Sequence, residues 1–124
     1  MGWDEADYQA LLARQNKKPA KRIIVDDRDK TEACFQARLT NFARERGWLH
    51  FHPHKNIQNV AGYPDLTMVR KRNGITRVIF AELKMRNGIV SDEQKIWLEL
   101  LSGAPVEVYV WYPKDWEDIE RILL

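Results

Sequence analysis

Apolar side chains recur along this chain with two different spacings, and each spacing predicts a type of secondary structure. Phe35, Leu39 and Phe42 are three or four residues apart, which places them on one face of a helix. Thr31 is a good helix N-cap residue, and Gly47 follows the last turn as helix-ending glycines commonly do. The pattern therefore predicts a helix that starts near Thr31 and ends at Gly47.

Alternating or continuous apolar runs predict strands in the middle and near the end of the chain. These runs cover residues 48–52, 65–71, 75–84 and 105–113. Between the second and third runs lies Asn73-Gly74, the dipeptide most typical of a two-residue hairpin turn. The second and third strands should therefore pair in an antiparallel hairpin.

Two further helices are predicted after the hairpin. The first begins after Ser91, where Gln94 holds the third helical position that completes a capping box, and it ends at Gly103. We expect it to bury four apolar side chains, those of Ile96, Trp97, Leu100 and Leu101. The second covers residues 114–124. The complete order predicts an α/β fold with a mixed central sheet flanked by helices.

The chain is long enough for one domain, which we expect over residues 31–124. It has 124 residues, of which 44% are hydrophobic, enough to build a single core. Residues 1–30 are predicted to be an appendage, with a short helix that carries Tyr8, Leu11 and Leu12 and a basic connector from Gln15 to Arg22.

The distribution of charge is more informative than the net charge of +2. Lys and Arg number 8 against 7 Asp and Glu in residues 1–40, 9 against 3 in residues 41–90, and 3 against 8 in residues 91–124. A basic middle segment favours a polyanionic partner such as DNA, with binding that weakens as salt rises. Most single charges in it are expected to be ordinary solvated ones.

Composition also indicates where the protein works. No apolar run approaches the roughly 20 residues that a membrane helix needs, and the first ten residues are acidic rather than basic and apolar. Cys34 is the sole cysteine, so an intramolecular disulfide is excluded, and we expect its side chain to be packed. These features predict a soluble protein with no membrane partner in a reducing, cytoplasmic compartment.

Three charged residues are predicted to converge on the hairpin. Asp65 opens the second strand, while Glu82 and Lys84 are two residues apart on the third and so share one face of the sheet. Hairpin pairing about Asn73-Gly74 brings Asp65 near both. Two carboxylates are typical ligands for Mg²⁺ or Mn²⁺, and a nearby ammonium can stabilise charge on a phosphate.

A glutamate and a lysine at this spacing are more often an ordinary cross-strand charge pair than catalytic groups. The surrounding sequence favours chemistry here. Glu82 and Lys84 interrupt VIFAELKM, a strand otherwise apolar enough to be central, where unused charges are costly.

Three spaced motifs resemble a known nuclease family. GYPDL at 62–66, AELK at 81–84 and SDEQKIWLELL at 91–101 are similar to the virus-type replication-repair nuclease (VRR-NUC) domain, a branch of the PD-(D/E)XK nucleases. The resemblance covers residues 31–111, with the motifs in the family's order, and residues 1–30 have no counterpart in that core. It implies an αβββαβ core and divalent-metal-dependent hydrolysis of phosphodiester bonds.

The resemblance also implies roles for individual residues. Asp65 and Glu82 would be metal ligands, Lys84 would be catalytic, and Gln94 would support the site from the following helix. Glu32 matches an acidic residue on the first core helix that adds to the metal ligands. An ordinary glutamate favoured by the dipole at a helix N-terminus explains Glu32 equally well.

Basic and histidine side chains are candidates for contact with DNA. Three histidines alternate along the chain, at His50, His52 and His54, as zinc ligands could. The sequence offers no thiolate and no clear fourth ligand, so contact with DNA phosphates is the favoured role. The Arg70 to Arg72 segment is either a solvated hairpin tip or a phosphate clamp. The predicted DNA-binding residues are Arg70, Lys71, Arg72, His52, His54, Lys55 and Arg86.

The leading hypothesis is a structure-selective DNA endonuclease of replication, repair or recombination, in a bacterial or phage-infected host cell. A homodimer that prefers branched DNA is consistent with the resemblance. One alternative is a sequence-specific restriction-like endonuclease, although so short a chain shows no evident base-reading loop. The other is a DNA-binding or assembly module that keeps the nuclease fold without activity.

Overall fold

The computed structural model describes residues 30–53 and 60–124. The predicted N-terminal helix and basic connector lie outside the described residues, as do His54 and Lys55. Among the helices that are described, none has the length and apolar character needed to cross a membrane.

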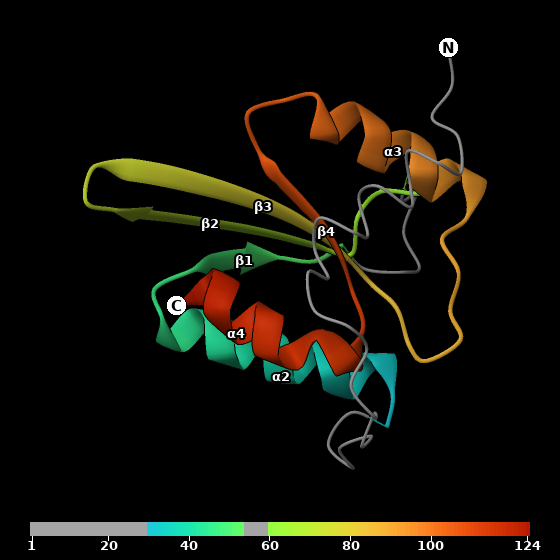
Figure 1. Ribbon diagram of the computed structural model, residues 1–124, viewed down its shortest axis with the longest axis horizontal. Helices are drawn as coiled ribbons and strands as arrows, with labels where there is room; N and C mark the ends of the chain where they lie inside the picture. The colour runs from blue at the N-terminus through green and yellow to red at the C-terminus, as the bar shows by residue number, and fades with distance from the viewer. Residues whose placement is uncertain (1–29, 54–59) are drawn as a thin grey trace.

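The order of helices and strands confirms the predicted αβββαβ core, followed by one more helix (Figure 1). A short 3-10 helix, Pro113–Asp115, leads into the last helix. The elements are α2 (Glu32–Glu45), β1 (Leu49–Phe51), β2 (Leu66–Arg72), β3 (Ile75–Leu83), α3 (Asp92–Ser102), β4 (Glu107–Trp111) and α4 (Trp116–Leu123).

The four strands form one mixed sheet in the order β1-β2-β3-β4. The first three strands are antiparallel, and β4 pairs parallel to β3 after the crossover through α3. Asn73 and Gly74 both have positive φ angles, 54° and 77°, as a type I′ turn requires. This turn sets the register that pairs Leu66 with Ala81, so Asp65 and Glu82 come next to each other on adjoining segments.

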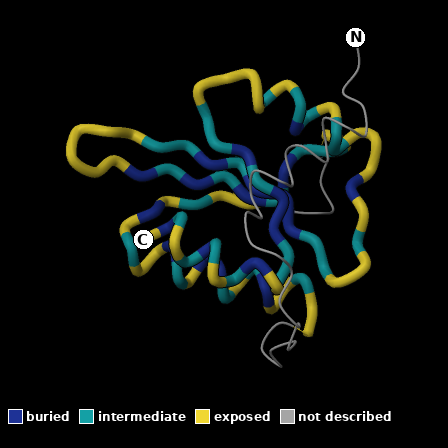
Figure 2. The backbone as a smooth tube through the Cα atoms, in the orientation of Figure 1, coloured by how far each residue is buried: buried dark blue, intermediate teal, exposed yellow. Residues whose placement is uncertain are grey.

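The main core lies between the sheet and the two helices α2 and α4, which pack together below the sheet in Figure 1. Ile79, Ala81 and Leu83 alternate along β3 and all point into this core. The buried segments of β2 and β3 form the centre of the molecule, whereas the hairpin tip is exposed (Figure 2). Glu82 and Lys84 have the opposite parity on the same segment and therefore belong to the other face.

Helix α3 covers only part of that other face, and here one prediction was wrong. Its buried residue is Leu98, which packs with Val90, Val108 and Val110. Ile96 and Leu100, predicted to be buried, are 57% and 70% exposed. The helix has apolar residues on more than one side, and the side that carries Leu98 faces β4. Only one of its apolar stripes can face the sheet.

The prediction that Cys34 is packed was also wrong, because its side chain is exposed in the first turn of α2. Its neighbour Phe35 is fully buried. Adjacent residues on a helix point about 100° apart, so only one of the two can reach the core.

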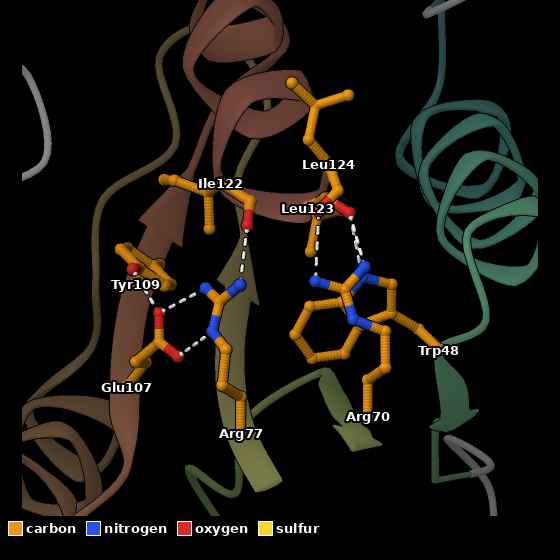
Figure 3. Close-up of polar contacts among 8 residues, drawn as sticks. All are labelled: Trp48, Arg70, Arg77, Glu107, Tyr109, Ile122, Leu123 and Leu124. Atoms are coloured by element: carbon orange, nitrogen blue, oxygen red, sulfur yellow. Dashed lines mark hydrogen bonds and ion pairs between the residues drawn. The ribbon is translucent and has the colours of Figure 1, made fainter. Parts of the chain in front are cut away.

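The C-terminal end of α4 is held by the side chains of Arg70 in β2 and of Trp48, just before β1 (Figure 3). Arg70 donates from its guanidinium to the carbonyls of Leu123 and Leu124, both at 3.0 Å, and to that of Arg46 at 3.2 Å. The indole of Trp48 also donates to the Leu123 carbonyl, at 3.0 Å. Carbonyls at a helix end lack intrahelical partners, so these donors satisfy them.

Arg70 is therefore not the phosphate contact or solvated tip residue that the sequence suggested. It is 7% exposed, lies within β2, and stacks its guanidinium over the Trp48 ring. A buried guanidinium already bonded to three carbonyls cannot also reach a DNA phosphate. The exposed end of β2 begins at the next residue, Lys71, and the turn itself is Asn73-Gly74.

We expect Arg70→Met to lower the free energy of unfolding by about 2–4 kcal/mol, because several buried carbonyls lose their donor. The matched control is Arg72→Met, which removes one exposed hydrogen bond to the Leu124 carbonyl and should cost less than about 1 kcal/mol. Urea unfolding followed by circular dichroism measures both. Equal losses for the two variants would contradict this role of Arg70.

Candidate active site

Asp65 stands directly before β2, at the end of an irregular segment. Its Oδ2 accepts a hydrogen bond of 2.8 Å from the backbone N–H of Leu83, on the neighbouring strand. The hairpin register thus fixes the carboxylate of Asp65 beside the end of β3, as the sequence predicted.

Glu82 is held from the opposite side by α3. The side chain of Gln94 donates from Nε2 to Oε1 of Glu82 at 2.8 Å. The carbonyl end of the same amide accepts from the N–H of Ser91 at 2.8 Å, and Ser91 Oγ accepts from Gln94 N–H, which completes the predicted capping box. Gln94 therefore links the start of the helix directly to the glutamate, and its amide orientation is fixed by both bonds.

Glu82 is only 1% exposed, although it is a charged residue type. Burial, together with the neighbouring Asp65 carboxylate, raises its pKa to about 9. Within the described residues, its Oε2 is buried and has no hydrogen-bond partner. Such a group is costly to bury unless something compensates it.

Lys84 follows β3 and completes the cluster. Its Nζ lies 3.9 Å from Oε1 of Glu82. Its backbone N–H donates to the carbonyl of Trp111 at 2.9 Å, so the pairing with β4 continues just past the end of the strand. That contact keeps Lys84 on the same face as Glu82.

The pair of carboxylates fits a hard divalent cation. Mg²⁺ is commonly bound by one or two carboxylates with water and substrate phosphate as its other ligands, so Asp65 and Glu82 suffice. The Oε2 atom of Glu82 is unpartnered among the described residues, and the pKa of the carboxyl is raised. A cation beside this carboxyl would stabilise its ionised form. Across the part of the chain that the structure describes, no group of three His, Cys, Asp or Glu side chains could hold a metal ion.

Glu32 lies near enough to this cluster for its charge to act on Glu82. It occupies the first turn of α2, where Thr31 caps the helix. After burial and Asp65, the charge of Glu32 is a further contribution that raises the pKa of Glu82. Its two interpretations, metal ligand and helix N-terminal glutamate, both stay open.

The other predicted DNA contacts are spread over the surface. Lys71, Arg72, Arg86 and His52 are exposed, and Arg72 also donates to the Leu124 carbonyl. The rings of His50 and His52 stack with centroids 6.4 Å apart. Burial lowers the pKa of His50, and the charges of His52 and Arg44 lower it further. His54 lies outside the described residues, so the histidine cluster stays untested as a set.

Sequence reasoning missed the backbone groups that hold the site. The N–H of Leu83 and the carbonyl of Trp111 leave no signal in a sequence, because every residue other than proline carries both groups. Gly62 was visible within the GYPDL motif, but its contact with the start of α3 was not predicted.

Comparison with known proteins identifies the family. The chain matches the VRR-NUC domain over residues 3–115, which is most of its length, and it belongs to that family. The match includes most of residues 1–30, for which the sequence resemblance had found no counterpart. No curated protein and no solved structure matches the chain. Membership implies a nuclease-type function on DNA, in a family that is typically dependent on divalent metal ions.

Proposed function

We propose that this protein is a divalent-metal-dependent DNA endonuclease whose active site comprises Asp65, Glu82 and Lys84, with Gln94 in support. The observation that carries this proposal is the buried Glu82 carboxyl placed beside Asp65 and 3.9 Å from the Lys84 ammonium. A nuclease fold alone does not require such a cluster, whereas metal-assisted phosphodiester hydrolysis uses carboxylates of this kind to hold the ion.

Each residue has a distinct task in this proposal. Asp65 and Glu82 would hold Mg²⁺ or Mn²⁺, which when bound supplies an acidified water and stabilises negative charge on the phosphate. Gln94 keeps Glu82 in one orientation through its 2.8 Å hydrogen bond. Lys84 has only donors, so its ammonium orients the attacking water or neutralises charge that develops on the phosphate.

The main alternative is a DNA-binding or assembly module without activity. Burial of Glu82 with an unpartnered oxygen argues against it, because a module without chemistry would gain stability from an apolar residue there. A restriction-like enzyme that reads sequence is the second alternative. Mapping of the cleavage positions distinguishes it from an enzyme selective for DNA shape.

For the DNA path we propose the exposed basic groups on the hairpin and after β3, those of Lys71, Arg72 and Arg86, together with His52 and the untested His54 and Lys55. We further propose that a homodimer acts on branched DNA in the cytoplasm, in replication, repair or recombination. Two cuts across a junction need two active sites, and twofold symmetry supplies them.

The test is cleavage of linear, flapped and four-way DNA in Mg²⁺, in Mn²⁺ and with a chelator. We expect cleavage only with metal, and a higher rate on branched substrates, at least about tenfold if two sites act together. Light scattering at micromolar concentration gives the oligomeric state of the same sample. Cleavage that persists in the chelator would contradict metal dependence, and a monomer that cuts linear and four-way DNA equally would contradict the dimer proposal.

A further inference from the structure

The segment that carries Asp65 has no regular secondary structure. Residues 60–65 form turns and irregular backbone before β2 begins at Leu66. Tyr63 N–H donates to the Val60 carbonyl at 3.2 Å, which closes one turn within it. The sheet holds Asp65 itself through the N–H of Leu83, but the strand ladder does not extend to residues 60–64, whose position depends on contacts with a neighbouring element.

That element is the first turn of α3. Gly62 has a φ of +84°, and a Cβ on it would lie 2.4 Å from the backbone carbon and 2.5 Å from the carbonyl oxygen of Glu93. No side chain larger than hydrogen fits such an approach, and a positive φ also favours glycine. The segment is thus in direct backbone contact with the helix three residues before Asp65.

Trp97 contacts the residues on both sides of Gly62. Its indole Nε1–H donates to the carbonyl of Ala61 at 3.2 Å. Its ring packs edge to face on Tyr63, with centroids 5.0 Å apart, and Tyr63 in turn packs on Phe80 of β3 at 6.5 Å. The tryptophan therefore holds the Asp65 segment between α3 and the sheet.

Gln94 and Trp97 are three residues apart, so they lie on the same side of α3. Gln94 holds Glu82, and Trp97 holds the segment that ends at Asp65. One helix therefore contacts both carboxylate-bearing segments, and it adds to the Leu83 N–H bond that already holds Asp65 beside β3.

We propose that Trp97 is a positioning residue that keeps Asp65 at the correct distance from Glu82 for a divalent cation. This inference rests on the proposed function, since it assumes that the two carboxylates bind metal. Trp97 contacts Ala61 and Tyr63, and it acts on Asp65 through these two residues.

The test is Trp97→Phe, which keeps an aromatic ring against Tyr63 and removes the donor to Ala61. Loss of one neutral hydrogen bond should weaken Mn²⁺ binding by about three- to tenfold in calorimetry. The Mg²⁺ concentration that gives half-maximal cleavage should rise by the same factor, while the rate at saturating Mg²⁺ recovers to within about twofold. Ile96→Ala, at the exposed neighbouring position, is the matched control and should change neither quantity.

A tryptophan that only stabilises the fold gives a different result: a lower melting temperature with unchanged Mn²⁺ affinity, which would overturn the proposal. If the parent protein itself binds no Mn²⁺, the proposed function fails instead, so the two failures are distinguishable.

A second measurement needs no variant. Binding linkage is reciprocal, so a hydrogen bond that favours metal binding must be strengthened by the metal. Saturating Mg²⁺ should slow hydrogen exchange of the Trp97 indole N–H by about three- to tenfold, followed by NMR on the parent protein. An exchange rate that Mg²⁺ leaves unchanged would overturn the proposal.

Discussion

Asp65→Asn and Glu82→Gln are each expected to abolish DNA cleavage and to weaken Mn²⁺ binding. Each change replaces an anionic oxygen ligand with a neutral amide while keeping the size of the side chain. We expect the cleavage rate to fall by at least about 10²–10³. Calorimetric titration of Mn²⁺ beside a plasmid-cleavage assay measures both effects.

The melting temperature of Glu82→Gln shows whether a loss of cleavage comes from the chemistry or from unfolding. Gln at position 82 can still accept the hydrogen bond from Gln94, and it removes the cost of burying a carboxylate. The melting temperature of Glu82→Gln should therefore not fall below that of the parent. Glu45→Gln is a matched control, because Glu45 is an exposed glutamate at the far end of α2. If Glu82→Gln bound metal and cut DNA like the parent, the assignment of the active site would be wrong.

The hairpin shows which parts of the fold could be predicted from sequence. Asn73-Gly74 specifies a two-residue turn, and once the turn is placed every pair along β2 and β3 follows, including the approach of Asp65 to Glu82. The capping box at Ser91 and Gln94 is equally local and was also predicted. These features depend on residues within a few positions of one another.

Features that depend on distant segments were not predictable in the same way. In the sequence Arg70 belongs to a basic hairpin tip, but in the structure it donates to carbonyls 53 and 54 residues later in the chain, those of the last residue of α4 and its C-cap. Which side of α3 faces the sheet was likewise misjudged, because Leu98 is buried by Val108 and Val110, whose position is set by the crossover. A helical pattern predicts that one side is buried, and with more than one apolar stripe it does not say which.

The candidate site falls between these cases. The convergence of Asp65, Glu82 and Lys84 follows from strand parity and register, both readable from sequence. The near-complete burial of Glu82 does not, since it requires α3 to pack over the end of β3. That burial is what distinguishes the cluster from an ordinary surface charge pair.

Lys84→Ala is expected to lose turnover while keeping both metal and DNA binding. The ammonium lies 3.9 Å from Glu82 Oε1 and has no acceptor to offer a cation, so its removal takes away no ligand. Lost stabilisation of charge in the transition state typically costs about 10²–10³ in rate. Single-turnover cleavage at saturating DNA measures the rate of the chemical step. Mn²⁺ calorimetry and a DNA-binding titration on the same variant measure its affinities for metal and for DNA.

Lys71→Ala is the matched control for Lys84→Ala, because Lys71 is an exposed lysine on the hairpin, away from the carboxylates. It should weaken DNA binding and reduce its salt dependence, since one phosphate contact is lost, but leave the rate at saturating DNA within about twofold of the parent. Loss of Lys84 would then lower the turnover rate, whereas loss of Lys71 would lower the affinity for DNA. If Lys84→Ala instead weakened DNA binding and kept its turnover, Lys84 would be a phosphate contact in the ground state, and the chemical step would have to be assigned to the carboxylates alone.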